Sequence, residues 1–153
     1  MTNSKKSSPP LKPTALMNFR KIDEELAKII GNFWKLTWHK EQPAIDQKTK
    51  YLLSLANAVG AGRFRQATRE LVKAYADGLT VSELDELFSL FVWNQGAGHF
   101  ASEIGPSSLF AAYQLIKESE EKSLDRFEVL KLLVEKFGEK NSAVGTGFHP
   151  AQK

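Results

Sequence analysis

The chain has 153 residues, 42% of them hydrophobic, which is enough for one globular domain with a buried core. It contains no cysteine, and this excludes disulfide bonds, thiolate metal ligands and thiol redox catalysis. The formal charge is only +3, and acidic and basic residues alternate along the body, so we expect no nucleic-acid partner.

The two ends of the chain differ in composition from its middle. Residues 1–14 are rich in Ser, Lys and Pro and lack the apolar core of a secretory signal. Residues 139–153 show no apolar period, and no apolar run in the chain approaches the roughly 20 residues of a membrane-spanning helix. We therefore expect a disordered tail over 1–14, a helical domain over 15–138 and a loose tail over 139–153, in a cytoplasmic protein without a membrane partner.

Apolar residues recur at steps of three and four along the first half of the domain, which predicts helices. The first begins at Ala15 and ends before Pro43. Its apolar stripe consists of Met17, Phe19, Ile22, Leu26, Ile29, Ile30, Phe33 and Trp34. The second helix follows Asp46 as a plausible N-cap. The third begins after Gly62 and ends at Gly78, a typical C-terminal cap.

The same period continues in the second half. Thr80 begins a helix, with Glu83 placed to complete a capping box. The segment 94–98 (NQGAG) should break that helix, and Pro106 is expected as the first residue of the next one. Ser123 is a candidate cap for a last helix that ends at Gly138. The sequence thus predicts an all-α bundle of about six helices, with no convincing strand alternation.

Three segments between residues 45 and 118 follow the pattern of a known helical family. Residues 48–53 (KTKYLL) resemble its opening K-T-R-E-L-I, and residues 74–83 resemble its A-x-x-x-G-x-T-x-x-E segment. Residues 94–112 occupy the place of its G-x-P-A loop and following helix, with Pro106 matching the proline. In these segments the chain resembles the carboxymuconolactone decarboxylase and alkylhydroperoxidase D-like family. The resemblance implies an alkylhydroperoxidase D-like helical bundle that assembles into a homo-oligomer, as a dimer, trimer or hexamer.

The peroxidatic members of this family carry a C-x-x-C-x-x-x-H motif, a histidine between the cysteines and a relay carboxylate in the opening segment. The matched positions hold Arg63, Gln66 and Glu70 for the motif, Arg65 for the intervening histidine and Tyr51 for the carboxylate. In that chemistry a thiolate attacks peroxide, and none of these residues can replace it. The chain is therefore not expected to be a cysteine-dependent peroxidase.

The decarboxylase branch of the family also lacks the dithiol, so the resemblance still allows acid/base chemistry on a carboxylated lactone. Arg63, Arg65 and Gln66 are candidates to bind such an anionic substrate, and Glu70 is a candidate base. Decarboxylase members resemble H-V-x-x-A-L-x-x-G where this chain has residues 70–78, so Glu70 replaces a histidine. Alternatively, Arg63, Arg69 and Glu70 form ion pairs at the surface or between subunits.

The segment 96–103 (GAGHFASE) contains a second group of candidates. If it is helical, His99 and Glu103 share one face at i and i+4, where a carboxylate would fix the imidazole tautomer for a general base. The neighbouring Trp93, Asn94 and Gln95 are candidate substrate-binding residues. Alternatively, His99 makes only a local hydrogen bond, Glu103 faces solvent and Trp93 lies in the core. Two ligands are too few for a metal site, and we expect neither a metal nor a cofactor.

Two classes of function fit these observations. The first is a cofactor-free enzyme of the lyase-like decarboxylase type, in which His99, Glu70 and Glu103 handle protons on a small anionic substrate. The second is a non-catalytic oligomeric binding or scaffold protein of the same family. An enzyme should bring His99 within hydrogen-bonding reach of Glu70, Glu103 or an arginine, whereas a scaffold should leave it in solvent or on its own helix.

Overall fold

The structure is a computed structural model that describes residues 11–13, 16–138 and 148–150. It is all-α except for one pair of very short strands, which agrees with the predicted fold class. The helices are α1 (Met17–Arg20), α2 (Glu24–Trp38), α3 (Gln47–Gly60), α4 (Phe64–Ala76), α5 (Val81–Gln95), α6 (Ala97–His99), the π-helical turn η1 (Phe100–Ile104), α7 (Ser108–Glu121) and α8 (Arg126–Phe137). None of these helices is long and apolar enough to cross a bilayer.

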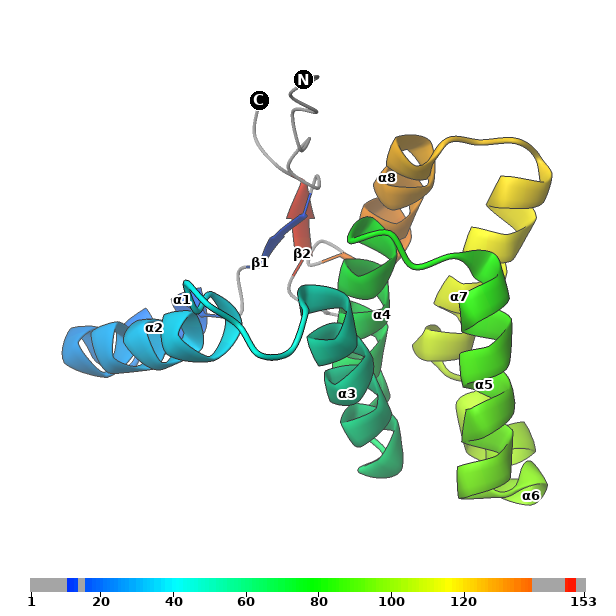
Figure 1. Cartoon of the computed structure of the whole chain (residues 1–153), viewed down its shortest axis with the longest axis horizontal. Coiled ribbons are helices and arrows are strands. Elements are labelled where there is room, and N and C mark those ends of the chain that lie inside the picture. Colours follow the sequence, from blue (N-terminus) through cyan, green and yellow to red (C-terminus); the bar gives the residue numbers. More distant parts are fainter. Residues whose placement is uncertain (1–10, 14–15, 139–147, 151–153) are drawn as a thin grey trace.

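A bundle of five helices contains the hydrophobic core. Helix α4 packs against α3, α7 and α8, and α5 packs against α7 (Figure 1). The largest side chains of the core that are fully buried are Tyr75, Leu55, Leu71, Leu79, Leu84, Ile104, Leu109, Ile116 and Leu133. Because α2 contributes no buried residue, the core forms without it.

The turns of the bundle follow several of the predicted signals. Asp46 caps α3 by accepting a hydrogen bond from the amide of Thr49 at 2.9 Å, as expected. Thr80 and Glu83 form the predicted capping box at the start of α5. Gly78 has a φ of 110°, a backbone conformation that favours glycine, and it ends α4 as predicted.

One predicted helix is divided, and two predicted helix starts are wrong. The expected first helix is divided in two, because Asp23 accepts a hydrogen bond from the amide of Leu26 at 2.8 Å and so begins α2 as a separate helix. Pro106 lies in a turn, and Ser107 is the N-cap of α7. Asp125 rather than Ser123 caps α8, in a capping box with Glu128.

Helices α1 and α2 lie to one side of the bundle, with α2 running across the direction of α3 and α4 (Figure 1). The end of α2 is held on α3, because Trp38 stacks on Tyr51 with ring centroids 5.3 Å apart and Lys50 donates a hydrogen bond to the carbonyl of Thr37 at 3.0 Å. The predicted apolar stripe is only partly covered: four of its eight residues are half-buried and four are exposed, with Ile29 57% and Phe33 65% exposed.

The two strands lie in the segments predicted to be tails. β1 (Leu11–Pro13) pairs antiparallel with β2 (Phe148–Pro150), a pairing that the sequence analysis did not foresee. The rest of the predicted tails, 1–10, 14, 139–147 and 151–153, lies outside the described residues.

Candidate functional site

The structure does not bring the predicted catalytic residues together within one chain. His99 ends α6 and Glu103 lies in η1, and both are exposed, whereas Glu70 is buried in α4. Among the described residues, no hydrogen bond or ion pair joins His99 to Glu70 or Glu103. The expected His99–Glu103 pair is therefore not seen. Glu103 is exposed, as in the alternative, but the local hydrogen bond that the alternative gave to the His99 ring is not seen among the described residues either.

The predicted substrate-binding residues are also dispersed. Arg63 and Arg65 are exposed at the start of α4, and Asn94 is exposed near the end of α5. Trp93 is 85% exposed, so the alternative that placed it in the core is wrong.

The end of α5 approaches the end of α3. The side-chain nitrogen of Gln95 would lie 3.9 Å from a Cβ added to Gly60, so the end of α5 lies close to the end of α3. Gln66 is half-buried in the first turns of α4. The residue at the end of α5 that approaches the α3–α4 junction is thus Gln95, whereas His99 is exposed.

Among the three predicted catalytic residues, Glu70 is the one that is buried beside charged partners. Its side chain is only 3% exposed, and Oε1 lies 3.3 Å from Nε of Arg69 and 3.3 Å from Nζ of Lys73. Arg69 and Glu70 thus form an ion pair, as in the alternative, but the pair lies within one chain and its carboxylate is buried rather than at the surface. The Glu70 carboxylate therefore has two cationic partners within the chain.

Lys73 connects this ion pair to the aromatic rings of α2 and α3. Its Nζ lies 5.6 Å from the ring centroid of Trp38 and 5.9 Å from that of Tyr51. Burial lowers the pKa of the Lys73 ammonium, against the opposing effect of the Glu70 carboxylate. Burial likewise raises the pKa of the Tyr51 hydroxyl. We call Trp38, Tyr51, Arg69, Glu70 and Lys73 the Lys73 cluster.

The Lys73 cluster includes two of the positions that the family resemblance singled out, Tyr51 and Glu70. Sequence reasoning missed Lys73 and the role of Trp38. A signal for Lys73 was present, because a lysine three residues after Glu70 falls on the same face of α4. No comparable signal exists for Trp38, since its contact with Tyr51 depends on how the chain turns between α2 and α3.

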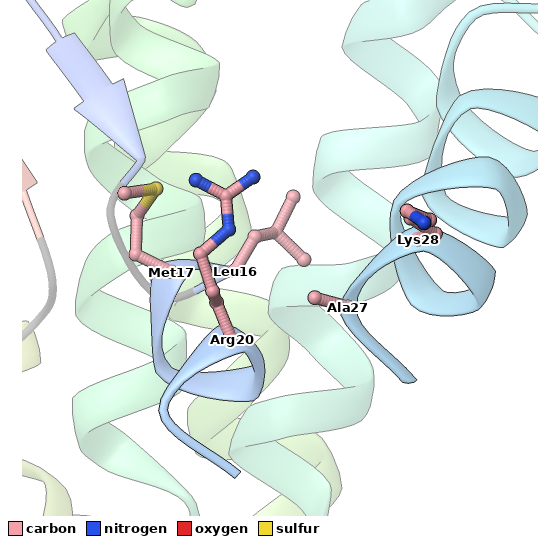
Figure 2. A pocket seen from close by; sticks show the side chains of 5 residues that line it. All are labelled: Leu16, Met17, Arg20, Ala27 and Lys28. Atoms are coloured by element: carbon pink, nitrogen blue, oxygen red, sulfur yellow. The ribbon is translucent and has the colours of Figure 1, made fainter. Parts of the chain in front are cut away.

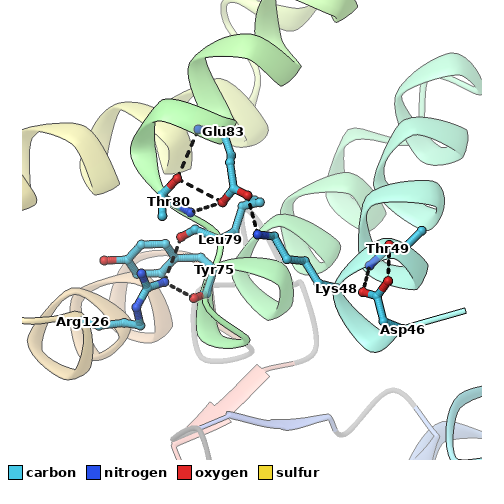
Figure 3. A network of polar contacts seen from close by, with 8 residues as sticks. All are labelled: Asp46, Lys48, Thr49, Tyr75, Leu79, Thr80, Glu83 and Arg126. Atoms are coloured by element: carbon cyan, nitrogen blue, oxygen red, sulfur yellow. Dashed lines mark hydrogen bonds and ion pairs between the residues drawn. The ribbon is translucent and has the colours of Figure 1, made fainter.

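A second polar network joins the starts of α3 and α5 to α8. Figure 3 shows Lys48 in an ion pair with Glu83, which also accepts a hydrogen bond from the backbone amide of Thr80 at 2.8 Å. Arg126 donates hydrogen bonds to the carbonyls of Tyr75 and Leu79 at the end of α4, the second at 2.9 Å. The contacts of Arg126 satisfy carbonyls that the end of a helix would leave without partners. The network therefore holds α8 on the end of α4 and α3 on the start of α5.

Glu83 should make the free energy of unfolding depend on pH in the acid range. The hydrogen bond from Lys48, followed by those from Thr80, lowers the pKa of the Glu83 carboxyl from 4.5 to about 2. Because the folded pKa is depressed, the stabilisation is complete above pH 4.5 and is lost as the pH falls toward about 2. Urea unfolding from about pH 6 to about pH 2 should show this loss in the wild type and a flatter profile in Glu83→Gln. Equal slopes for the two proteins would contradict the assignment.

A shallow hollow of about 180 Å³ lies between α1 and α2, away from every predicted site residue (Figure 2). It is lined by Leu16, Met17, Arg20, Ala27 and Lys28. Its two cations already pair with carboxylates of α2, Arg20 with Glu24 at 3.9 Å and Lys28 with Glu25 at 3.3 Å. The hollow therefore offers no unpaired charge to an anionic ligand.

Within the described residues, no group of three or more His, Asp or Glu side chains could hold a metal ion. In the comparisons with known proteins, no family model, no curated protein and no solved structure matches the chain. The family resemblance thus rests on the residues quoted above.

Proposed function

We propose that this chain is a non-catalytic, self-associating helical binding or scaffold protein of the carboxymuconolactone decarboxylase-like type. The observation that carries this proposal is α2, an amphipathic helix of 15 residues of which none is buried. Large apolar side chains on a helix that contributes nothing to its own core are typical of a surface that another protein covers. Ile29, Phe33 and Leu36 are 57%, 65% and 64% exposed.

The dispersal of the predicted catalytic groups supports the same proposal. A general base and its partner must lie within hydrogen-bonding reach of one substrate position, and His99 has neither Glu70 nor Glu103 beside it. Glu70 is held between Arg69 and Lys73, an arrangement that stabilises the contact of α4 with α3 and the end of α2.

Acid/base catalysis on a small carboxylated or lactone substrate is the second candidate, and the Lys73 cluster is what favours it. A lysine with a lowered pKa next to a buried carboxylate and two aromatic rings is a combination found at reactive sites. In this version Glu70 and Lys73 take the place of His99 as the proton-handling groups.

The first experiment measures the native mass of the full chain by light scattering over a range of concentrations. The proposal expects a multiple of the 17.1 kDa chain mass at the higher concentrations. A parallel thermal-shift screen uses small carboxylates and lactones with the wild type and with His99→Ala. A monomer at every concentration would reject self-association, and a ligand shift that disappears in His99→Ala would restore His99 as a site residue.

A further inference from the structure

The exposed side of α2 carries a regular apolar seam. Leu26, which is half-buried, and the exposed Ile29, Phe33 and Leu36 follow one another at steps of three, four and three residues. This is the alternation of a coiled-coil contact, in which each step keeps the side chains on one narrow stripe of the helix. A seam of this kind is complementary to a second helix with the same spacing, and the nearest source of such a helix is another copy of this chain.

The opposite side of α2 is occupied within the chain. Ala27 lines the hollow against α1, and Trp38 is held between Tyr51 and Lys73. Because these contacts use one side of α2 and the end of the helix, the seam is left outward, on the part of the molecule that lies to one side of the bundle (Figure 1). A second helix could therefore lie along the seam without displacing a contact described above.

The charges of α2 determine which direction of pairing is favourable. Its first turn carries Glu24 and Glu25 after the N-cap Asp23, with Arg20 and Lys28 beside the two glutamates, whereas its last turn carries Lys35, and Lys40 follows the helix. Parallel copies would place the acidic ends together. Antiparallel copies place each acidic end beside the basic end of the other helix and align the two helix dipoles in opposite directions.

On these grounds we propose that two copies of this chain pair through antiparallel α2 helices, with the seam of each copy covering that of the other. The arrangement is a closed two-fold contact, in which the same surface is used on both copies. The inference rests on the proposed self-association and names the surface responsible for it.

The first test compares two substitutions of the same kind. Phe33→Asp puts a charge in the middle of the seam, and Leu90→Asp does the same at an exposed leucine of α5 that is outside it. We expect Phe33→Asp to raise the dissociation constant at least about 100-fold, since each dimer contains two copies of the change, and Leu90→Asp to leave it unchanged. Circular dichroism checks that both variants keep their helices.

The second test determines the direction of pairing and uses the absence of cysteine in the chain, so that a single introduced cysteine has no competitor. A disulfide requires Cα atoms within about 7 Å of each other. In an antiparallel pair Asn32→Cys lies near the two-fold axis and should form a cross-linked dimer under oxidation. Glu25→Cys lies near the start of α2, far from its own copy, and should not.

The outcomes separate this inference from the function on which it rests. If the wild type stays monomeric, both the α2 contact and the proposed self-association are rejected. A chain whose seam is covered by another segment of the same chain would give this result. An oligomer that is insensitive to Phe33→Asp, or that is dissociated by Leu90→Asp instead, preserves self-association and rejects the α2 contact. Equal cross-linking of Glu25→Cys and Asn32→Cys rejects the antiparallel arrangement.

Discussion

Replacing Glu70 with glutamine should lower the free energy of unfolding by about 3 kcal/mol and the melting temperature by roughly 6–12 °C. The substitution keeps the shape of the side chain but leaves Lys73 and Arg69 without their carboxylate. The side chains of these residues are only 18% and 25% exposed, so water cannot replace the lost partner fully. Chemical denaturation followed by circular dichroism measures the change.

Glu103→Gln is the matched control, because Glu103 is exposed and should change stability by less than about 0.5 kcal/mol. The dependence on pH gives a second measurement. The folded pKa of Lys73 lies below 10.5, so the unfolded chain binds more protons and stability should rise as the pH approaches 10.5. Loss of the Glu70 charge should steepen that rise, and an unchanged slope would show that Lys73 is not coupled to Glu70.

Phe88→Ala should cost about 4 kcal/mol, the largest effect expected for a single substitution in the aromatic part of the core. Phe88 is 4% exposed, and its ring centroid lies 4.2 Å from that of Tyr113 and 5.3 Å from that of Phe91. Removing the ring leaves a cavity between α5 and α7 that these neighbours cannot fill without leaving their own positions. Urea titration at neutral pH provides the measurement.

Trp93→Ala removes an even larger side chain from the same helix and serves as the comparison. Because Trp93 is 85% exposed, its loss should change the free energy of unfolding by no more than about 0.5 kcal/mol. A large cost at Trp93 would mean that another copy of the chain covers α5, which would also contradict the assignment of self-association to α2.

Local signals predicted much of the fold. The Thr80–Glu83 capping box and the left-handed Gly78 depend only on residues close in the sequence, and both are where they were expected. The predictions failed where two local signals compete. Asp23 is a good N-cap inside a continuous apolar pattern, and Ser107 directly follows the proline that was expected to begin the helix. Only the three-dimensional packing decides between such alternatives.

The candidate site was less predictable than the fold. Family resemblance indicated Glu70 and Tyr51, which do lie in one cluster around Lys73. It could not indicate that Trp38 would complete the cluster. The prediction at His99 required the histidine to lie within hydrogen-bonding reach of Glu70, Glu103 or an arginine. In the structure Gln95 approaches the end of α3, and His99 is exposed.

The pairing of β1 with β2 has a consequence for how this chain avoids unwanted sheet growth. The register sets Leu11 opposite Pro150 and Pro13 opposite Phe148, so each end of the pair contains a proline. Proline has no backbone N–H, and neither end pair can therefore exchange two ladder hydrogen bonds. Among the described residues the ladder has three residue pairs, and these offer few donors to a strand from another molecule. The proposed association between copies therefore depends on helices, whose side chains specify a partner, rather than on backbone edges, which do not.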